Sequence, residues 1–127
     1  MQEEMEPRLI YVGLEAIIQF QDTGDTLGCV IQDIAEDYTQ AMVMTSDPRI
    51  CTDENIELQV ILLAERSPIK CTGKIIWHSK DDKGYLARIL IIHFSRIERR
   101  RFELAIAQKK AFDNSGRSAG VSSQRFH

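Results

Sequence analysis

The sequence predicts a mainly β protein, a six-stranded antiparallel barrel or sandwich followed by one C-terminal helix. Six apolar, β-rich runs are separated by turn residues about every ten positions, a spacing typical of antiparallel sheets. No run alternates with a helical pattern, which argues against a parallel α/β sheet. The 127 residues fit one domain, because two domains would each be too small to bury much core.

The first three predicted strands cover residues 14–20, 26–34 and 39–45. The segment Asp22-Thr23-Gly24-Asp25 separates the first two strands, and these residue types tolerate tight turns. Alternation in the third run divides its side chains between two faces: Ala41, Val43 and Thr45 on one, Met42 and Met44 on the other.

The last three predicted strands cover residues 56–64, 69–79 and 85–94. Pro68 separates the first two of these, because proline cannot donate to a strand ladder. The final run contains four consecutive apolar residues at 89–92, which predicts a strand covered on both faces.

A helix is predicted over residues 96–112. Ser95 at the N-cap and Glu98 at N3 form a capping box, in which a hydroxyl and a carboxylate satisfy two orphan amides reciprocally. An apolar stripe recurs at helical spacing and consists of Phe102, Ala105 and Ile106. This stripe is too narrow for a helix buried on all sides, so we expect the helix to lie against the barrel or at an interface.

Polar segments flank the predicted domain. Asp-Asn-Ser-Gly at 113–116 predicts the end of the helix. The residues after it are mostly small and polar, so too few apolar groups are present to repay the entropy of ordering. The predicted organisation is an N-terminal tail 1–7, a domain 8–112 made of barrel 8–94 and helix 96–112, and a flexible C-terminal tail 113–127.

Charge is distributed unevenly along the chain. Residues 1–95 carry 8 Lys/Arg and 16 Asp/Glu, a net of −8, whereas residues 96–127 carry 8 Lys/Arg and 3 Asp/Glu, a net of +5. The overall net of −3 therefore conceals an acidic body and a basic C-terminal segment. Such asymmetry indicates two different surfaces.

The sequence indicates a cytoplasmic protein without membrane insertion. The N-terminus, Met-Gln-Glu-Glu-Met-Glu, is acidic where a signal peptide would be basic, and no apolar run approaches the roughly 20 residues that a membrane helix needs. The three cysteines are too few and too widely spaced for a disulfide framework or a zinc site. We therefore expect free thiols in a reducing compartment at Cys29, Cys51 and Cys71.

No pattern in the sequence indicates an enzyme or a metal site. There is no glycine-rich phosphate loop and no nucleophile paired with a base. Asp33, Glu36 and Asp37 form a carboxylate cluster without a nucleophile, which is typical of solvated loop acids. His78 and His93 could lie on adjacent strands, but a metal site needs at least a third ligand.

Two short motifs resemble those of PilZ domains. Gly73-Lys74-Ile75-Ile76-Trp77 is similar to the Gly-x-[Val/Ile]-x-Trp run of the fifth strand in that family. Ile91-Ile92-His93-Phe94 is similar to the Gly-[Val/Ile]-x-Phe run of the sixth strand, with Ile91 in place of the glycine. The resemblance extends over roughly residues 8–112 and implies a six-stranded PilZ-like β-barrel with a C-terminal α-helix.

PilZ domains are known as receptors for the bacterial second messenger cyclic di-GMP, which they bind through two motifs. In Arg-x-x-x-Arg, Arg8 matches the first arginine and Val12 replaces the second. In [Asp/Asn]-x-Ser-x-x-Gly, Asp33 matches, Ala35 replaces the serine and Tyr38 replaces the glycine. Arginines supply bidentate donors to phosphates and guanine edges, and the glycine permits close approach of the backbone.

These departures predict weak cyclic di-GMP binding or none. Each lost charged hydrogen bond costs about 1.5–3 kcal/mol, so losing one arginine and the serine weakens binding by about two to four decades. Glu36 and Asp37 add negative charge where a dianionic ligand would lie. The family resemblance then implies a non-enzymatic bacterial signalling or adaptor protein that acts through protein contacts, for example in motility or pilus regulation.

The start of the helix offers a candidate partner surface, consisting of Arg96, Arg99, Arg100 and Arg101. Cations at a helix N-terminus oppose the macrodipole, and a locally unfavourable choice is sometimes functional. The alternative is that these arginines are solvated and pair with the acidic barrel.

Two other functions remain open from the sequence. One is a true cyclic di-GMP receptor with a rebuilt site that uses Arg8, Asp33 and the C-terminal arginines. The other is a small nucleic-acid-binding barrel, which the acidic body disfavours. The sequence is compatible with a monomer or a homodimer, and no cofactor is expected.

Overall fold

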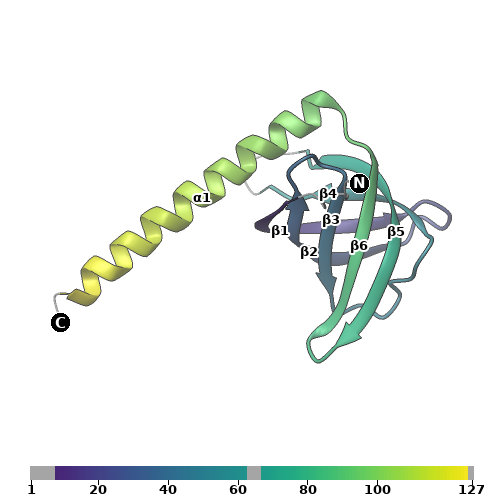
Figure 1. Cartoon of the computed structure of the whole chain (residues 1–127), viewed down its shortest axis with the longest axis horizontal. Helices are drawn as coiled ribbons and strands as arrows, with labels where there is room; N and C mark the ends of the chain where they lie inside the picture. Colours follow the sequence, from purple (N-terminus) through teal and green to yellow (C-terminus); the bar gives the residue numbers. More distant parts are fainter. Residues whose placement is uncertain (1–7, 63–66, 126–127) are drawn as a thin grey trace, which may run out of the picture.

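The structure is a computed structural model that describes residues 8–62 and 67–125, with side chains for 8–62 and 67–111. Six antiparallel strands close into one barrel, and a single helix follows them (Figure 1). The elements are β1 (Leu9–Phe20), β2 (Thr26–Ala35), β3 (Gln40–Thr45), β4 (Asn55–Val60), β5 (Ile69–Asp81), β6 (Gly84–His93) and α1 (Arg96–Arg125). Their order around the barrel is β1-β2-β3-β6-β5-β4, which confirms the predicted fold class.

The barrel interior is filled by alternate side chains of every strand. The third predicted strand has the expected faces, because Ala41, Val43 and Thr45 are buried inside. The largest fully buried side chains are Phe102, Ile18, Ile31, Ile56, Ile69, Ile75, Ile89 and Val43. Inward-facing and outward-facing side chains therefore alternate along each strand, as a closed barrel requires.

Two strand boundaries differ from the prediction by more than two residues. β1 begins at Leu9, five residues earlier than expected, because a bulge at Gly13 carries the strand through a position that reads as a breaker. Gly13 has φ +64°, which glycine adopts without strain. β4 ends at Val60 instead of residue 64, and residues 63–66 lie outside the described part of the chain.

The prediction that the final strand is covered on both faces is wrong. Leu90 is 39% exposed and Ile92 is 62% exposed on the outer surface of β6. The main strand contact of α1 among the described elements is with β5, and it leaves Leu90 and Ile92 on β6 uncovered. The apolar run therefore gives β6 a buried inner face and an exposed apolar outer face.

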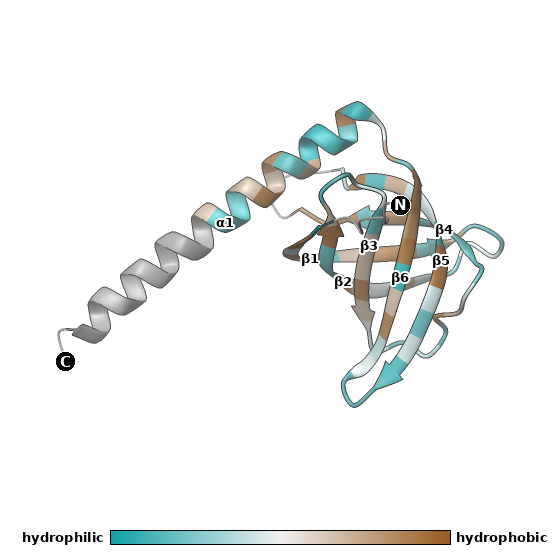
Figure 2. Cartoon of the chain, viewed as in Figure 1, coloured by the Kyte–Doolittle hydropathy of each residue, from teal (hydrophilic) through white to brown (hydrophobic). Residues whose placement is uncertain are grey.

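The helix begins where the sequence predicts. The Ser95 hydroxyl accepts a hydrogen bond from the Glu98 amide at 3.2 Å, which is one half of the capping box. The Glu98 carboxylate instead accepts a hydrogen bond from Arg101, at 2.9 Å. Phe102 and Ala105 are buried against the barrel, as the narrow stripe predicts, and polar and apolar residues alternate along these first turns (Figure 2).

The helix end differs from the predicted one. α1 continues to Arg125, through the Asp-Asn-Ser-Gly segment that was expected to end it at residue 112. A glycine inside a helix costs only about 1 kcal/mol relative to alanine, and no proline follows to force a stop. The side chains of residues 112–127 lie outside the described part, and the flexibility of 113–127 stays a prediction.

The three cysteines are free, and their burial predicts unequal reactivity. Burial raises the pKa of Cys29 and of Cys71 to about 12, whereas Cys51 is exposed. We expect one thiol to react with Ellman's reagent at pH 8 in the folded protein, and all three in guanidinium chloride, because only the thiolate is nucleophilic. Cys51→Ser should abolish the reaction of the folded protein with Ellman's reagent at pH 8. A thiol that still reacts rapidly in this variant would contradict the assignment to Cys51.

Candidate functional site

The two segments that correspond to the cyclic di-GMP motifs lie side by side at one end of the barrel. Tyr11 of β1 is paired with Asp33 of β2. The carbonyl of Arg8 accepts a hydrogen bond from the Glu36 amide at 2.8 Å. The backbone therefore brings the two segments together, and the side chains decide what this region can bind.

Two of the replaced motif positions are buried, and Val12 belongs to the barrel core. Val12 is 3% exposed and Ala35 is fully buried at 0%. An arginine at position 12 would place an unpaired charge among apolar side chains, which is strongly unfavourable. In this chain Val12 serves core packing, so an arginine cannot be restored at this position by simple reversion.

The charged groups at the motif region include one ion pair and two further carboxylates. Arg8 forms an exposed ion pair with Glu36, with 3.8 Å between the guanidinium and the carboxylate. The Asp37 carboxylate accepts hydrogen bonds from the amide and the hydroxyl of Thr39, and the hydroxyl chiefly lowers the pKa of Asp37. Partial burial raises the pKa of Asp33. The region thus presents three carboxylates and one arginine to any ligand.

Tyr38, which stands at the glycine position of the second motif, joins this region to the helix. Its φ is +61°, the left-handed region that glycine favours. Its ring makes edge contacts with Phe94 and Phe102, with centroids at 5.6 and 6.1 Å. Its hydroxyl donates to Glu103 at 3.5 Å, and burial together with this carboxylate raises the pKa of Tyr38.

The four helix arginines divide into two groups. Arg101 is half-buried and donates to the carbonyls of Ser67 and Pro68, at 2.6 and 3.2 Å, so it fastens the β4–β5 connection to α1. The Arg99 guanidinium lies 5.2 Å from the centroid of the Tyr38 ring. Both are therefore tied to the fold.

Arg96 and Arg100 are exposed to solvent, and neither has an ion-pair partner among the side chains that the structure describes. Ile97 lies beside them and is 74% exposed. A shallow cavity of about 520 Å³ is lined by Arg96, Ile97, Arg99, Arg100, Arg101 and Glu103. This surface combines free cations with an exposed apolar side chain, which suits a protein contact.

A row of side chains that includes Asp33 crosses the outer face of the barrel. The strand register aligns five residues across β1, β2, β3, β6 and β5: Tyr11, Asp33, Met42, Arg88 and Trp77. The Arg88 guanidinium lies 5.9 Å from the Trp77 ring centroid, and Trp77 is 43% exposed. Sequence reasoning missed Arg88, because only the strand register places it in line with Asp33.

The two strand histidines do not come together. His78 is paired with Ala87 and His93 with Thr72, six positions apart along β5, which corresponds to roughly 20 Å. His78 is within 2.7 Å of the Thr52 hydroxyl. The described residues contain no cluster of three or more metal-ligating side chains, and no helix among them is long and apolar enough to cross a bilayer.

Comparisons with known proteins relate the chain to PilZ domains by fold. No protein-family model matches it, and no curated protein matches it. Among solved structures, it is similar to the PilZ domain of CeSA from a cellulose-synthesizing bacterium, with a TM-score of 0.55 and 16% sequence identity. The match covers 80% of this chain and 98% of that chain. The barrel therefore has a PilZ-like fold, as the motif at residues 73–77 predicts.

Proposed function

We propose that this chain is a non-enzymatic PilZ-type signalling adaptor that acts through protein contacts and has lost tight cyclic di-GMP binding. The observation that carries the proposal is the role of Tyr38. At a position where the family has a small residue beside the ligand, this chain has a large side chain that packs on Phe94 and Phe102 and fastens the helix. The motif loop thus supports a protein surface.

The electrostatics of the motif region support the same proposal. A cyclic dinucleotide carries two phosphates and needs cationic donors that are free to engage it. Arg8 already faces Glu36, and Asp33 and Asp37 add further negative charge. Binding here would require desolvation of carboxylates beside phosphates, which like-charge repulsion opposes.

The helix start is the surface that we assign to the protein partner. Arg96 and Arg100 have no ion-pair partner among the described side chains, and Ile97 between them in sequence is exposed. Arginine and exposed aliphatic side chains are typical of binding surfaces, because a cation gives orientation while the apolar group gives burial. An acidic segment in the partner would complement this surface. Bacterial signalling in the cytoplasm is the setting that the family resemblance suggests.

Calorimetric titration with cyclic di-GMP tests the proposal directly. We expect no saturable heat and no thermal shift up to about 100 μM ligand, a bound of roughly −5.5 kcal/mol on the binding free energy. A cyclic di-GMP-binding PilZ domain serves as the positive control. Saturable binding with a Kd below about 10 μM would overturn the proposal.

A rebuilt cyclic di-GMP site is the second candidate, and the row on the outer face favours it. Arg88 and Trp77 lie in register with Asp33, so they offer a cation and a stacking surface where the family motif lacks its second arginine. If the titration shows binding, Arg88→Ala should abolish it, whereas Arg96→Ala at the exposed helix start should not.

A further inference from the structure

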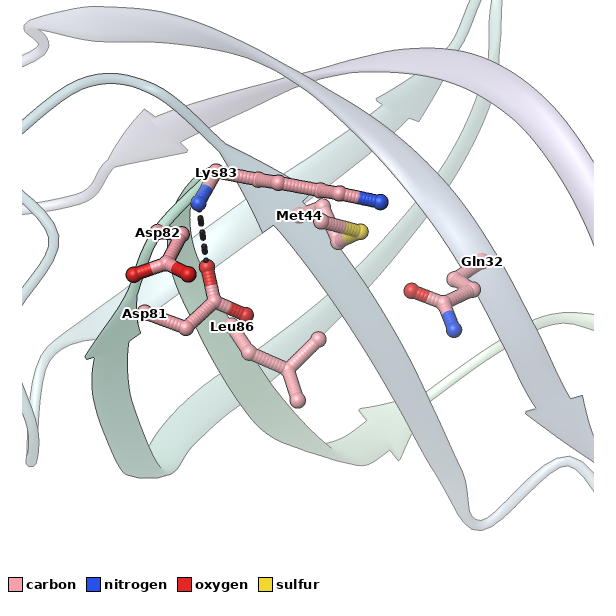
Figure 3. Close-up of a pocket in the computed structure, with 6 residues that line it drawn as sticks. All are labelled: Gln32, Met44, Asp81, Asp82, Lys83 and Leu86. Atoms are coloured by element: carbon pink, nitrogen blue, oxygen red, sulfur yellow. Dashed lines mark hydrogen bonds between the residues drawn. The ribbon is translucent and has the colours of Figure 1, made fainter.

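A second polar groove lies on the barrel, away from the helix. It has a volume of about 440 Å³ and is lined by Gln32, Met44, Asp81, Asp82, Lys83 and Leu86 (Figure 3). Met44 and Leu86 are direct partners across β3 and β6, and they form an apolar floor. The turn of the β5–β6 hairpin supplies the two carboxylates along one edge.

The acceptors in this groove are not fully used. The Gln32 side-chain oxygen is buried and has no hydrogen-bond partner among the described residues. Gln32 is the extra residue of a bulge in β2, which turns its side chain toward the groove. Asp81 accepts a single hydrogen bond, from the amide of Lys83 at 2.8 Å. A buried acceptor without a donor is unfavourable, so a donor in the groove would favour rotation of the Gln32 amide toward it.

The groove fits the side chain of an arginine. An aliphatic stem can lie over Met44 and Leu86, while a guanidinium donates to the carboxylates at the edge of the groove. Figure 3 shows that the Lys83 side chain already extends across the groove above Met44. This arrangement shows that a cation on an aliphatic stem fits there, and it makes Lys83 a competitor for an incoming cation.

The chain itself carries the complementary surface. Arg96 and Arg100 at the start of α1 are exposed and lack ion-pair partners among the described side chains, and Ile97 beside them is 74% exposed. Two cations around an apolar side chain match two carboxylates around an apolar floor. The net charges of the two parts of the chain are also complementary. Residues 1–95, which contain the groove, carry −8, and residues 96–127, which contain the helix, carry +5.

We infer that two copies of this chain associate. The arginine-rich helix start of one copy lies on the polar groove of the other copy, the groove that Gln32, Met44 and Asp82 help to line. The inference shares only the helix arginines with the proposed function. It does not depend on cyclic di-GMP. The titration tests whether the chain binds cyclic di-GMP, whereas a measurement of self-association tests the groove. Complementary charge drives the contact, so salt should weaken it.

Sedimentation velocity from 5 to 300 μM at low salt tests the inference with the full chain. The wild-type protein should sediment faster as concentration rises, and 0.5 M NaCl should reverse the change. Saturation at a dimer indicates a closed pair and continued growth an open chain, and either supports the contact. A monomer throughout this range overturns it.

A charge exchange identifies the two surfaces. Asp82→Arg and Arg100→Glu should each weaken association at least about tenfold, because each places like charges together. The double variant Asp82→Arg/Arg100→Glu should recover much of the loss, which neither unfolding nor general charge effects would produce. Asp22→Arg makes the same charge change in the exposed β1–β2 turn, outside the groove, and should leave association unchanged.

A gain of association provides a second check. Lys83→Ala removes the competing cation from the groove, so we expect tighter association than in the wild-type protein. Unchanged or weaker association in this variant, or no recovery in the double variant, would contradict the assignment of the groove.

Discussion

Replacement of Phe102 by alanine is expected to lower the free energy of unfolding by about 3–5 kcal/mol. Phe102 is 1% exposed, and its ring makes edge contacts with Tyr38 and Phe94. The substitution removes the apolar surface that fastens the helix and leaves a cavity between the three rings. Urea unfolding, followed by the fluorescence of the single tryptophan, Trp77, measures the loss.

Leu104→Ala is the matched control for this prediction. Leu104 lies two residues further along the same helix and is 51% exposed, so its truncation should cost well under 1 kcal/mol. Equal losses in the two variants would show that the helix start does not depend on packing against the barrel. The Phe102→Ala variant also bears on function. A helix that no longer packs on Tyr38 would not hold Arg96 and Arg100 in place.

The strands could be predicted from the sequence because a barrel imposes a simple periodicity. Apolar, β-rich runs between polar turns indicate all six strands in the sequence, and Ser95 indicates the start of the helix. The start of β1 was missed because Gly13 reads as a breaker, whereas it is a bulge inside a longer strand. The helix end was missed because glycine and asparagine only weaken a helix, so local signals set its end poorly.

The candidate site could be predicted only in part. Comparison with the family motifs draws attention to positions 12, 35 and 38, yet it could not tell that Val12 faces the core and that Ala35 is fully buried. Strand parity decides this, and a single bulge reverses parity. Arg88 could not be found from spacing either, since its alignment with Asp33 passes through two strand pairings.

Tyr38 lies in a backbone conformation that is unusual for a large side chain. Tyr38 keeps the positive φ that a glycine would adopt at this position. The strain of a large residue in this region is offset by its contacts with Phe94, Phe102 and Glu103. The loop conformation is therefore supported by the packing of Tyr38 against Phe94 and the helix.

Gly73→Ala is expected to destabilise the barrel by about 3 kcal/mol, in the upper part of the range for overpacked cores. A Cβ at this position would lie 2.6 Å from the carbonyl oxygen of Leu90 and 2.8 Å from the Ile89 side chain. The first contact is with backbone that is held in the β3–β6 ladder, so it cannot move without loss of strand pairing. Urea unfolding again measures the change.

Gly28→Ala is the control that separates this clash from a general effect of glycine in strands. Gly28 is exposed, and a Cβ there would meet nothing within 4 Å. The alanine should therefore leave stability unchanged or raise it by about 0.5–1 kcal/mol, because glycine loses more backbone entropy on folding. If Gly73→Ala behaved like Gly28→Ala, the glycine of the Gly-x-Ile-x-Trp segment would have no packing role. A large difference would instead show that this glycine is required by the close approach of β6 to β5.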